Sequence, residues 1–262
     1  MLGAIYGDTV GSVYEFNNIK TKDFPLFIDD SEFTDDSVMT VAVAEALLRL
    51  RDRDDLAAFR KTLISVMHHY GELYPFAGYG GRFAVWLGGK RTKPYGSYGN
   101  GSAMRVSSVA WYAESLAEAL TLAKASADIT HDHPEGIKGA ECTAGAIFLA
   151  RTGASREQIR DFVCGYYDIG FTLEEIRPTY RFNETCQRSV PQAIVAFLES
   201  TDFEDTIRNA ISIGGDSDTI AAIAGSVAEG FYGMTSQQKE DALSRLAPHL
   251  RTVADIFAAR YI

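Results

Sequence analysis

The sequence has few cysteines, and their spacing does not suggest a disulfide-stabilised fold. Its 262 residues include three cysteines, Cys142, Cys164 and Cys186. The number is odd and no two form a close CxxC pair, so a disulfide framework is not expected. We expect free thiols that pack as small hydrophobic residues, in a reducing compartment.

The sequence also lacks long apolar runs and a net positive charge. No uncharged stretch reaches the roughly 18 residues of a membrane span. Met1 to Thr9 contains no basic segment before an apolar one, so no signal peptide is predicted and a cytoplasmic location is expected. Lys and Arg total 25 against 35 Asp and Glu, a formal charge of −10. Such a surface disfavours sequence-independent binding to nucleic acids, although a local site can still bind a small phosphate-bearing ligand.

Apolar residues recur mostly at helical spacing. Residues 37–50 carry one wide apolar face, and no alternating pattern is long enough for a sheet. No Pro-rich or Ser-rich linker divides the chain, so we predict an all-α, compact, single-domain orthogonal multi-helix bundle over residues 1–262. The other predicted helices span residues 55–70, 103–113, 116–127, 135–151, 156–166, 184–198, 203–213, 219–231, 236–246 and 252–261.

Two long segments are predicted to be irregular. They span residues 17–33 and 71–101, and the second is rich in Gly and Tyr. Long irregular segments in a compact domain often carry function.

Two short acidic segments precede apolar helices. They are Thr34-Asp35-Asp36-Ser37 and, after two glycines, Asp216-Ser217-Asp218-Thr219. Helix capping explains one Asp at each place, because the free N–H groups and the dipole favour an acceptor there. Two carboxylates and a hydroxyl at each start exceed that need, and four carboxylates brought together would repel without a cation. The ligands are all hard oxygens, which favours magnesium, manganese or calcium over zinc. Capping and metal binding both remain open on spacing alone.

A third acidic element, Gly7-Asp8-Thr9-Val10-Gly11-Ser12-Val13-Tyr14-Glu15, begins near the N-terminus. Gly7 and Gly11 lie four residues apart, which gives a bare helix face for close packing. Glu15 ends this helix and faces the first long loop. A lone Glu is most often solvated, so its interest depends on what lies near it.

A glycine-rich loop runs from Gly96 into a helix. Its backbone N–H groups could bind an anion, Tyr98 could stack on a base, and Arg105 could pair with a phosphate or a carboxylate. The loop has neither the P-loop lysine nor the GxGxxG order, so a plain turn is the alternative. His131 could contact a ligand, bind a metal or lie in an exposed turn. Its i, i+2 spacing to His133 argues against a zinc pair.

Five segments in this order resemble the ADP-ribosylglycohydrolase family, which includes dinitrogenase-reductase-activating glycohydrolases and ADP-ribosyl-arginine and ADP-ribosyl-serine hydrolases. They are GDTVGSVYE (7–15), FTDDS (33–37), SYGNGSAMR (97–105), THDHPEG (130–136) and GGDSDTIAAIAGSVAEGFYG (214–233). The resemblance implies an all-α fold with a binuclear metal cleft that holds two Mg²⁺ ions, with Mn²⁺ as an alternative. It implies Thr34, Asp35, Asp36, Asp216, Asp218 and Thr219 as metal ligands, Glu15, Asp35 and Asp36 as catalytic, and Ser97, Tyr98, Gly99, Asn100, Gly101, Arg105 and His131 as substrate-binding.

The resemblance implies a magnesium-dependent hydrolase that removes ADP-ribose from a protein side chain or a small molecule by cleaving the C1″ glycosidic bond. Arginine, serine, acetyl and nucleic-acid linkages are all compatible with the motifs. The alternatives are a hydrolase of O-acetyl-ADP-ribose or a related ADP-ribose derivative, a non-catalytic ADP-ribose-binding protein, and a protein that occludes an ADP-ribosylating toxin. The motifs set no oligomeric state.

Overall fold

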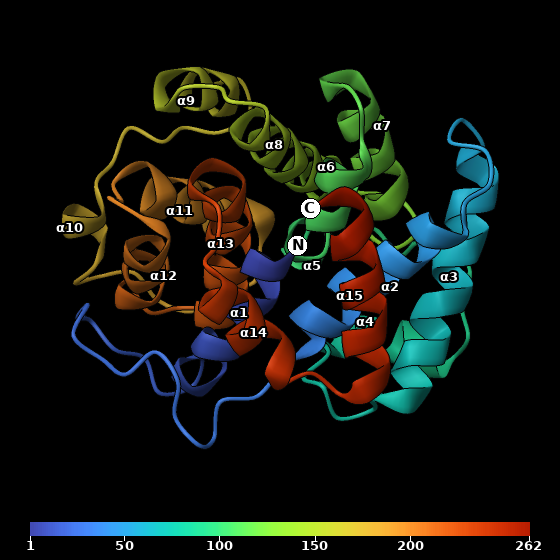
Figure 1. Cartoon of the computed structure of the whole chain (residues 1–262), viewed down its shortest axis with the longest axis horizontal. Helices are drawn as coiled ribbons and strands as arrows, with labels where there is room; N and C mark the ends of the chain where they lie inside the picture. Colours follow the sequence, from blue (N-terminus) through green and yellow to red (C-terminus); the bar gives the residue numbers. More distant parts are fainter.

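The computed structural model describes residues 1–262, which form fifteen α-helices and one 3₁₀ turn but no sheet (Figure 1). The prediction of an all-α fold is therefore confirmed. The elements are α1 (Leu2–Gly11), η1 (Ser12–Tyr14), α2 (Asp35–Arg49), α3 (Leu56–Leu73), α4 (Gly81–Gly88), α5 (Gly101–Met104), α6 (Ser107–Tyr112), α7 (Leu116–Ala127), α8 (Pro134–Arg151), α9 (Arg156–Cys164), α10 (Leu173–Ile176), α11 (Cys186–Leu198), α12 (Phe203–Ser212), α13 (Ser217–Tyr232), α14 (Ser236–Ser244) and α15 (Pro248–Tyr261).

Helices α1 and α13 pack backbone to backbone at the centre of the fold. Gly3, Gly7 and Gly11 lie four residues apart and so share one face of α1. A Cβ atom at each of them would overlap the backbone of α13, at Gly225, Ala221 and Asp218 respectively. The glycines therefore allow the start of α13 to lie directly beside the end of α1.

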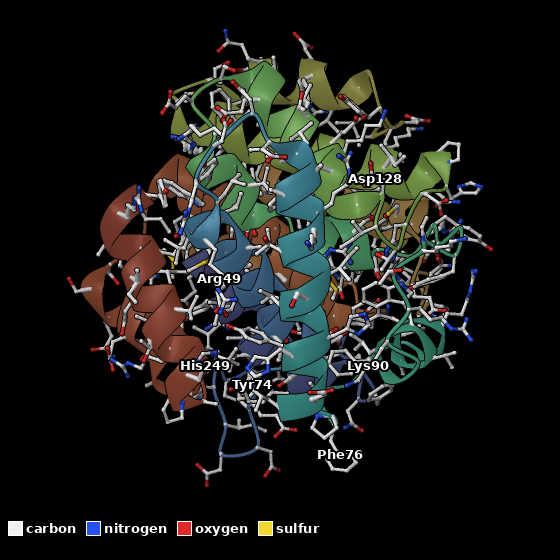
Figure 2. The ribbon with its side chains drawn as sticks, turned by 90° about the vertical axis from the view of Figure 1, so that its right-hand side faces the viewer. Arg49, Tyr74, Phe76, Lys90, Asp128 and His249 are labelled. Atoms are coloured by element: carbon white, nitrogen blue, oxygen red, sulfur yellow. The ribbon has the colours of Figure 1, made fainter.

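Helix α2 begins beside this pair. Thr34 is its N-cap, and its side chain accepts a hydrogen bond from the Asp36 N–H at 3.3 Å. Figure 2 shows α3 crossing the outside of the molecule, with α15 and its His249 next to it. Arg60 of α3 donates hydrogen bonds of 2.8 and 2.6 Å to Asp128, which follows α7. Helices α3 and α15 thus cover the outer side of α2, while its start lines the cleft described below.

The buried hydrophobic side chains form one continuous cluster of 75 residues, to which almost every helix contributes. No helix combines the length and the apolar character needed to cross a membrane. All three cysteines are free thiols; Cys142 and Cys186 are buried and Cys164 is exposed.

The structure differs from the predicted helices in three places, one of which is the short helix α10, which was not predicted. The segment 71–101 contains helix α4, whose Phe83, Trp86 and Leu87 are buried at helical spacing. Flanking glycines obscure this short pattern in the sequence. The helix predicted over residues 103–113 is broken into α5 and α6 at Arg105, whose guanidinium turns inward to the Ser126 carbonyl at the end of α7.

Candidate functional site

One cleft of about 320 Å³ is lined by every residue that the sequence indicated as a candidate site residue. The metal-ligand candidates come from the starts of α2 and α13, Glu15 follows η1, and the substrate-binding candidates come from the 97–105 segment and His131. These segments are far apart in the sequence. The fold therefore places the five motifs on one surface.

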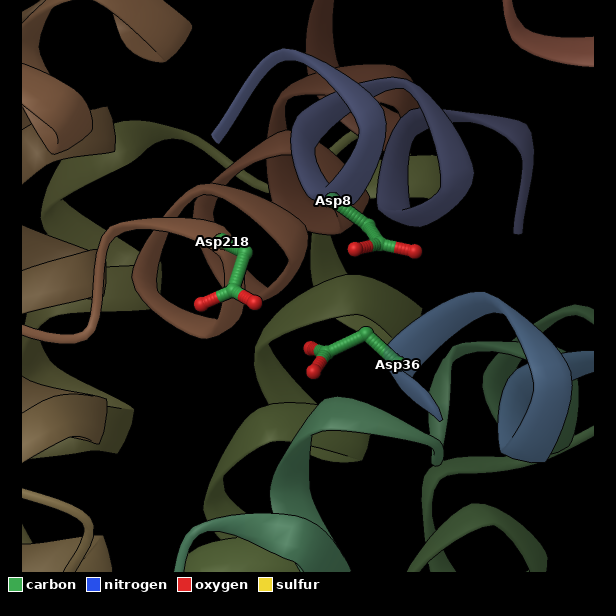
Figure 3. A group of neighbouring side chains, drawn as sticks. All are labelled: Asp8, Asp36 and Asp218. Carbon is green, nitrogen blue, oxygen red and sulfur yellow. The ribbon is translucent and has the colours of Figure 1, made fainter. Parts of the chain in front are cut away.

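Carboxylates from three helices converge at one end of the cleft. Asp8, Asp36 and Asp218 project toward one another from α1, α2 and α13 (Figure 3), with one oxygen of each within 4.8 Å of the others. Glu15, Asp216 and Asp218 form a second such group. Asp218 belongs to both groups, so two neighbouring cation positions would share it. Asp35 lines the same cleft but belongs to neither group.

The crowding of these carboxylates changes their protonation. Burial, followed by the neighbouring charge of Asp218, raises the pKa of Asp36 well above its usual range. Burial likewise raises the pKa of Asp216 to about 6 and that of Glu15 to about 8. Like charges held together in a low dielectric are costly, and a cation removes that cost.

The side chains present fit a hard divalent cation. Asp36 is 2 % exposed, and its Oδ1 is buried without any hydrogen-bond partner. Its Oδ2 accepts a bond from the Thr219 hydroxyl at 3.0 Å, and the Thr34 hydroxyl donates to Asp8 at 2.7 Å. Both hydroxyls use their proton within the protein and keep lone pairs for a ligand. This all-oxygen set matches a hard cation such as magnesium, manganese or calcium.

Asp8 is a site residue that sequence reasoning missed as a candidate. It is fully buried, and its Oδ2 accepts bonds from the Thr34 N–H at 3.0 Å, from the Ser37 N–H at 3.0 Å and from the Ser37 hydroxyl. Since the Thr34 hydroxyl donates to Oδ1, both carboxylate oxygens of Asp8 accept hydrogen bonds. Asp8 therefore fixes the start of α2 to α1 and holds Thr34 and Asp36 in place.

Asn18 is a second missed residue, in the loop after Glu15. Its Nδ2 donates to the carbonyls of Tyr14, Glu15 and Gly215 at 2.7, 2.8 and 3.0 Å, and its Oδ1 accepts from the Gly215 N–H at 2.6 Å. Gly214 and Gly215 have φ angles of +64° and +82°, a left-handed backbone that glycine adopts without steric cost. Asn18 thus ties the Glu15 segment to the turn that precedes Asp216.

The glycine-rich loop is attached to the carboxylate cluster through Asn100. Its Nδ2 donates to Asp216 at 2.7 Å and to Ser189 at 3.0 Å, and its N–H donates to the Glu184 carbonyl at 2.8 Å. Tyr98 packs against His133, with ring centroids 5.1 Å apart, and is 43 % exposed, so part of its ring remains accessible to a ligand. The loop and the cluster therefore lie next to each other in a single site.

Arg105 and His131 lie in the wall of the cleft. Arg105 is 1 % exposed and donates to the Ser126 carbonyl at 2.6 Å and to the Thr130 hydroxyl at 3.0 Å. Its pKa is lowered to about 10 by burial. His131 is 4 % exposed, which rules out the exposed-turn interpretation. His133 instead caps α8 by accepting from the Glu135 N–H at 3.1 Å.

The rest of the cleft lining comes from segments without a recognisable motif. Gly78, Gly80, Gly81 and Arg82 line the cleft on the α4 side, and Phe182 lines it near α11. Phe182 stacks on the exposed Phe16 next to Glu15, with ring centroids 6.4 Å apart. The length of the 71–101 loop indicated the α4 side of this lining in the sequence, and no sequence signal indicated Phe182.

Comparisons with known proteins agree with this arrangement. The chain is 27% identical to human ADP-ribosylhydrolase ARH3, over 89% of this chain and 84% of that protein. It is 24% identical to the ADP-ribosylarginine hydrolase Tri1 of Pseudomonas putida (strain GB-1), over 92% and 71% of the two chains. A solved ADP-ribosylglycohydrolase-related protein complex contains a chain with the same fold, with a TM-score of 0.67, 20% identity, and coverage of 100% of this chain and 97% of that one.

The ADP-ribosylglycohydrolase family model matches residues 1–261, which is nearly the whole chain and includes every motif in the cleft. Members of this family are hydrolases of glycosidic bonds, and the relatives above carry hydrolase names. The chain belongs to the ADP-ribosylglycohydrolase family.

Proposed function

We propose that this chain releases ADP-ribose from a modified side chain or small molecule by cleaving the C1″ glycosidic bond, with two magnesium ions in the cleft. The observation that carries the proposal is the pair of carboxylate groups that share Asp218. They line a cleft that is also lined by a glycine-rich loop suited to a nucleotide, whose Asn100 donates a hydrogen bond to Asp216. A binuclear centre next to a phosphate-binding loop suits a substrate with a diphosphate and a ribose.

We assign the metal ligands to the two helix starts; of the other members of the two carboxylate groups, Asp8 holds the start of α2 and Glu15 is assigned to proton transfer. Thr34, Asp35 and Asp36 come from one, and Asp216, Asp218 and Thr219 from the other. Bound magnesium ions would orient the ribose hydroxyls and polarise a water molecule or the leaving atom. Manganese fits the same ligands.

The remaining residues bind the substrate and move a proton. The Ser97–Gly101 loop would bind the diphosphate, and Tyr98 would stack on the adenine. Glu15 lies within 4.8 Å of Asp216 and Asp218 and lines the cleft, which supports our assignment of the scissile bond to its neighbourhood. Cleavage of a glycosidic bond develops positive charge on the sugar, which a carboxylate stabilises. Glu15 would also transfer the proton between water and the leaving group.

The first test is release of free ADP-ribose from arginine-, serine- and acetyl-linked substrates, with and without magnesium. We expect release from at least one, lost on chelation and restored by magnesium. The arginine-linked substrate is included because the relative Tri1 is named an ADP-ribosylarginine hydrolase. Release that persists after complete chelation would contradict the proposed metal dependence. Magnesium-dependent binding of ADP-ribose without any release would favour the non-catalytic alternative.

A second prediction concerns the anchor of the Glu15 segment. We expect Asn18→Ala to lower the hydrolysis rate about tenfold or more, since small misplacement of a catalytic group costs up to about a hundredfold. The affinity for ADP-ribose should change little, because Asn18 does not line the cleft. The matched control is the exposed neighbour Asn17→Ala, which should behave as the wild type. Equal rates for both variants would show that Asn18 does not position Glu15.

A further inference from the structure

A chain of hydrogen bonds connects buried Arg105 to the surface of the cleft. The Arg105 Nη2 donates to the Thr130 hydroxyl at 3.0 Å, and the same hydroxyl lies 2.7 Å from the His131 Nδ1. Thr130 has no exposed surface, and His131 and Arg105 are exposed by 4 % and 1 %. The three side chains thus form one buried unit that ends at the cleft wall.

The position of each proton in this unit follows from the donors and acceptors present. The Thr130 hydroxyl has one proton, and its only other partner is the Arg105 N–H, which must donate. If the His131 Nδ1 also donated to it, the Thr130 proton would have no acceptor in a buried place. If Thr130 donates to Nδ1, the hydroxyl proton, the Arg105 Nη2–H and the Nδ1 lone pair are all paired. The second arrangement places the ring proton of neutral His131 on Nε2.

The Nε2 atom of His131 faces the glycine-rich loop. A Cβ atom at Gly101 would lie 3.3 Å from Nε2, and one at Gly99 would lie 3.7 Å from it. Because glycine has no side chain, neither residue blocks the Nε2 edge of the ring. The N–H on Nε2 therefore points to the part of the cleft where the loop would bind an anionic ligand.

The surroundings of His131 keep the ring neutral. Burial, followed by the charges of Arg105 and Arg82, lowers the pKa of His131 well below its usual range. Tyr95 packs against its ring, with centroids 6.1 Å apart, and Arg82 lies over the Tyr95 ring. A neutral donor with a buried cation behind it suits an oxygen that carries negative charge and no proton, such as a phosphate oxygen.

We propose that Thr130 and Arg105 are positioning residues that hold His131 in the Nε2–H form, so that it donates a hydrogen bond to a diphosphate oxygen of the ligand. The identity of that ligand rests on the proposed function. His131 then acts neither as a metal ligand through Nε2 nor as a general base, because the lone pair needed for both is on Nδ1 and is used by Thr130.

The test is the ring ¹⁵N–¹H NMR spectrum of His131 in the full chain without ligand, with the signal assigned by comparison with His131→Gln. We expect the pattern of a proton on Nε2 in the wild type and in Thr130→Ser. Thr130→Val removes the hydroxyl at nearly constant shape and should shift the signal toward the other tautomer. Thr143→Val is the matched control, since the buried Thr143 hydroxyl has no partner. A proton on Nδ1 in the wild type, or no change in Thr130→Val, would overturn the proposal.

Calorimetric binding of ADP-ribose with magnesium tests the consequence. We expect about tenfold weaker binding for Thr130→Val, from loss of a hydrogen bond to a charged group, and near wild-type binding for Thr130→Ser and Thr143→Val. His131→Gln should retain most of the affinity, because its amide N–H can replace the Nε2 donor. Unchanged affinity in Thr130→Val would overturn the role in binding. If the wild type does not bind ADP-ribose, the proposed function fails, while the NMR result still decides the tautomer.

Discussion

Asp36→Asn is expected to lower hydrolysis about a thousandfold or more and, without divalent cations, to raise the melting temperature. The carboxylate carries a buried oxygen without a hydrogen-bond partner and lies among Asp8, Asp216 and Asp218. Removal of a charge that stabilises a transition state typically costs a factor of about 10² to 10³, and loss of a metal ligand costs more. The same substitution relieves like-charge repulsion, and its amide can donate to a neighbouring carboxylate.

Thermal melting with and without magnesium separates these two effects. We expect magnesium to raise the melting temperature of the wild type, because a ligand that binds only the folded state stabilises it. Asp36→Asn should lose this increase yet melt about 2–4 °C higher than the wild type in chelator, the shift for about 1 kcal/mol in a protein of this size. Asp30→Asn, at an exposed carboxylate in the long loop, is the control that should change neither quantity. A full magnesium response in Asp36→Asn would contradict its assignment as a ligand.

The sequence predicted those parts of the site whose signal is local. Two carboxylates and a hydroxyl at a helix start can be recognised without the fold, since capping needs only one acceptor. Spacing could not decide between capping and metal binding. In the structure Thr34 caps α2 and also lies at the cluster, so the two interpretations are compatible.

The contacts that sequence reasoning missed join residues far apart in the chain. Asp8 becomes important only when α1 packs on α2, and Asn18 only when its loop reaches Gly215, 197 residues later. A lone Asp or Asn carries no signal of a distant partner. Helix α4 was missed for a different reason, because its single apolar turn is surrounded by glycines. Long-range partners and short helices in loops are therefore where the sequence is least informative.

The glycines of α1 offer the second large effect. We expect Gly7→Ala to lower the free energy of unfolding by about 2 kcal/mol or more. Alanine favours a helix over glycine by about 1 kcal/mol, but the added Cβ would overlap the Ala221 carbonyl oxygen. Overpacking costs typically about 1–3 kcal/mol and more where the neighbour cannot move. The neighbour here is the backbone of a buried helix, so the steric cost exceeds the gain in propensity.

Thermal and chemical unfolding measure this cost, and Gly88→Ala is the matched control because its Cβ would meet no atom within 4 Å. We expect Gly7→Ala to melt about 4–8 °C or more below the wild type and Gly88→Ala to melt at or slightly above it. Relief of the overlap would move α1 away from α13. Asp8 would then lie farther from Asp218, so the protein that remains folded should bind magnesium more weakly. Magnesium should therefore stabilise Gly7→Ala less than the wild type. An equal magnesium response would mean that the carboxylate cluster does not depend on the contact between these two helices.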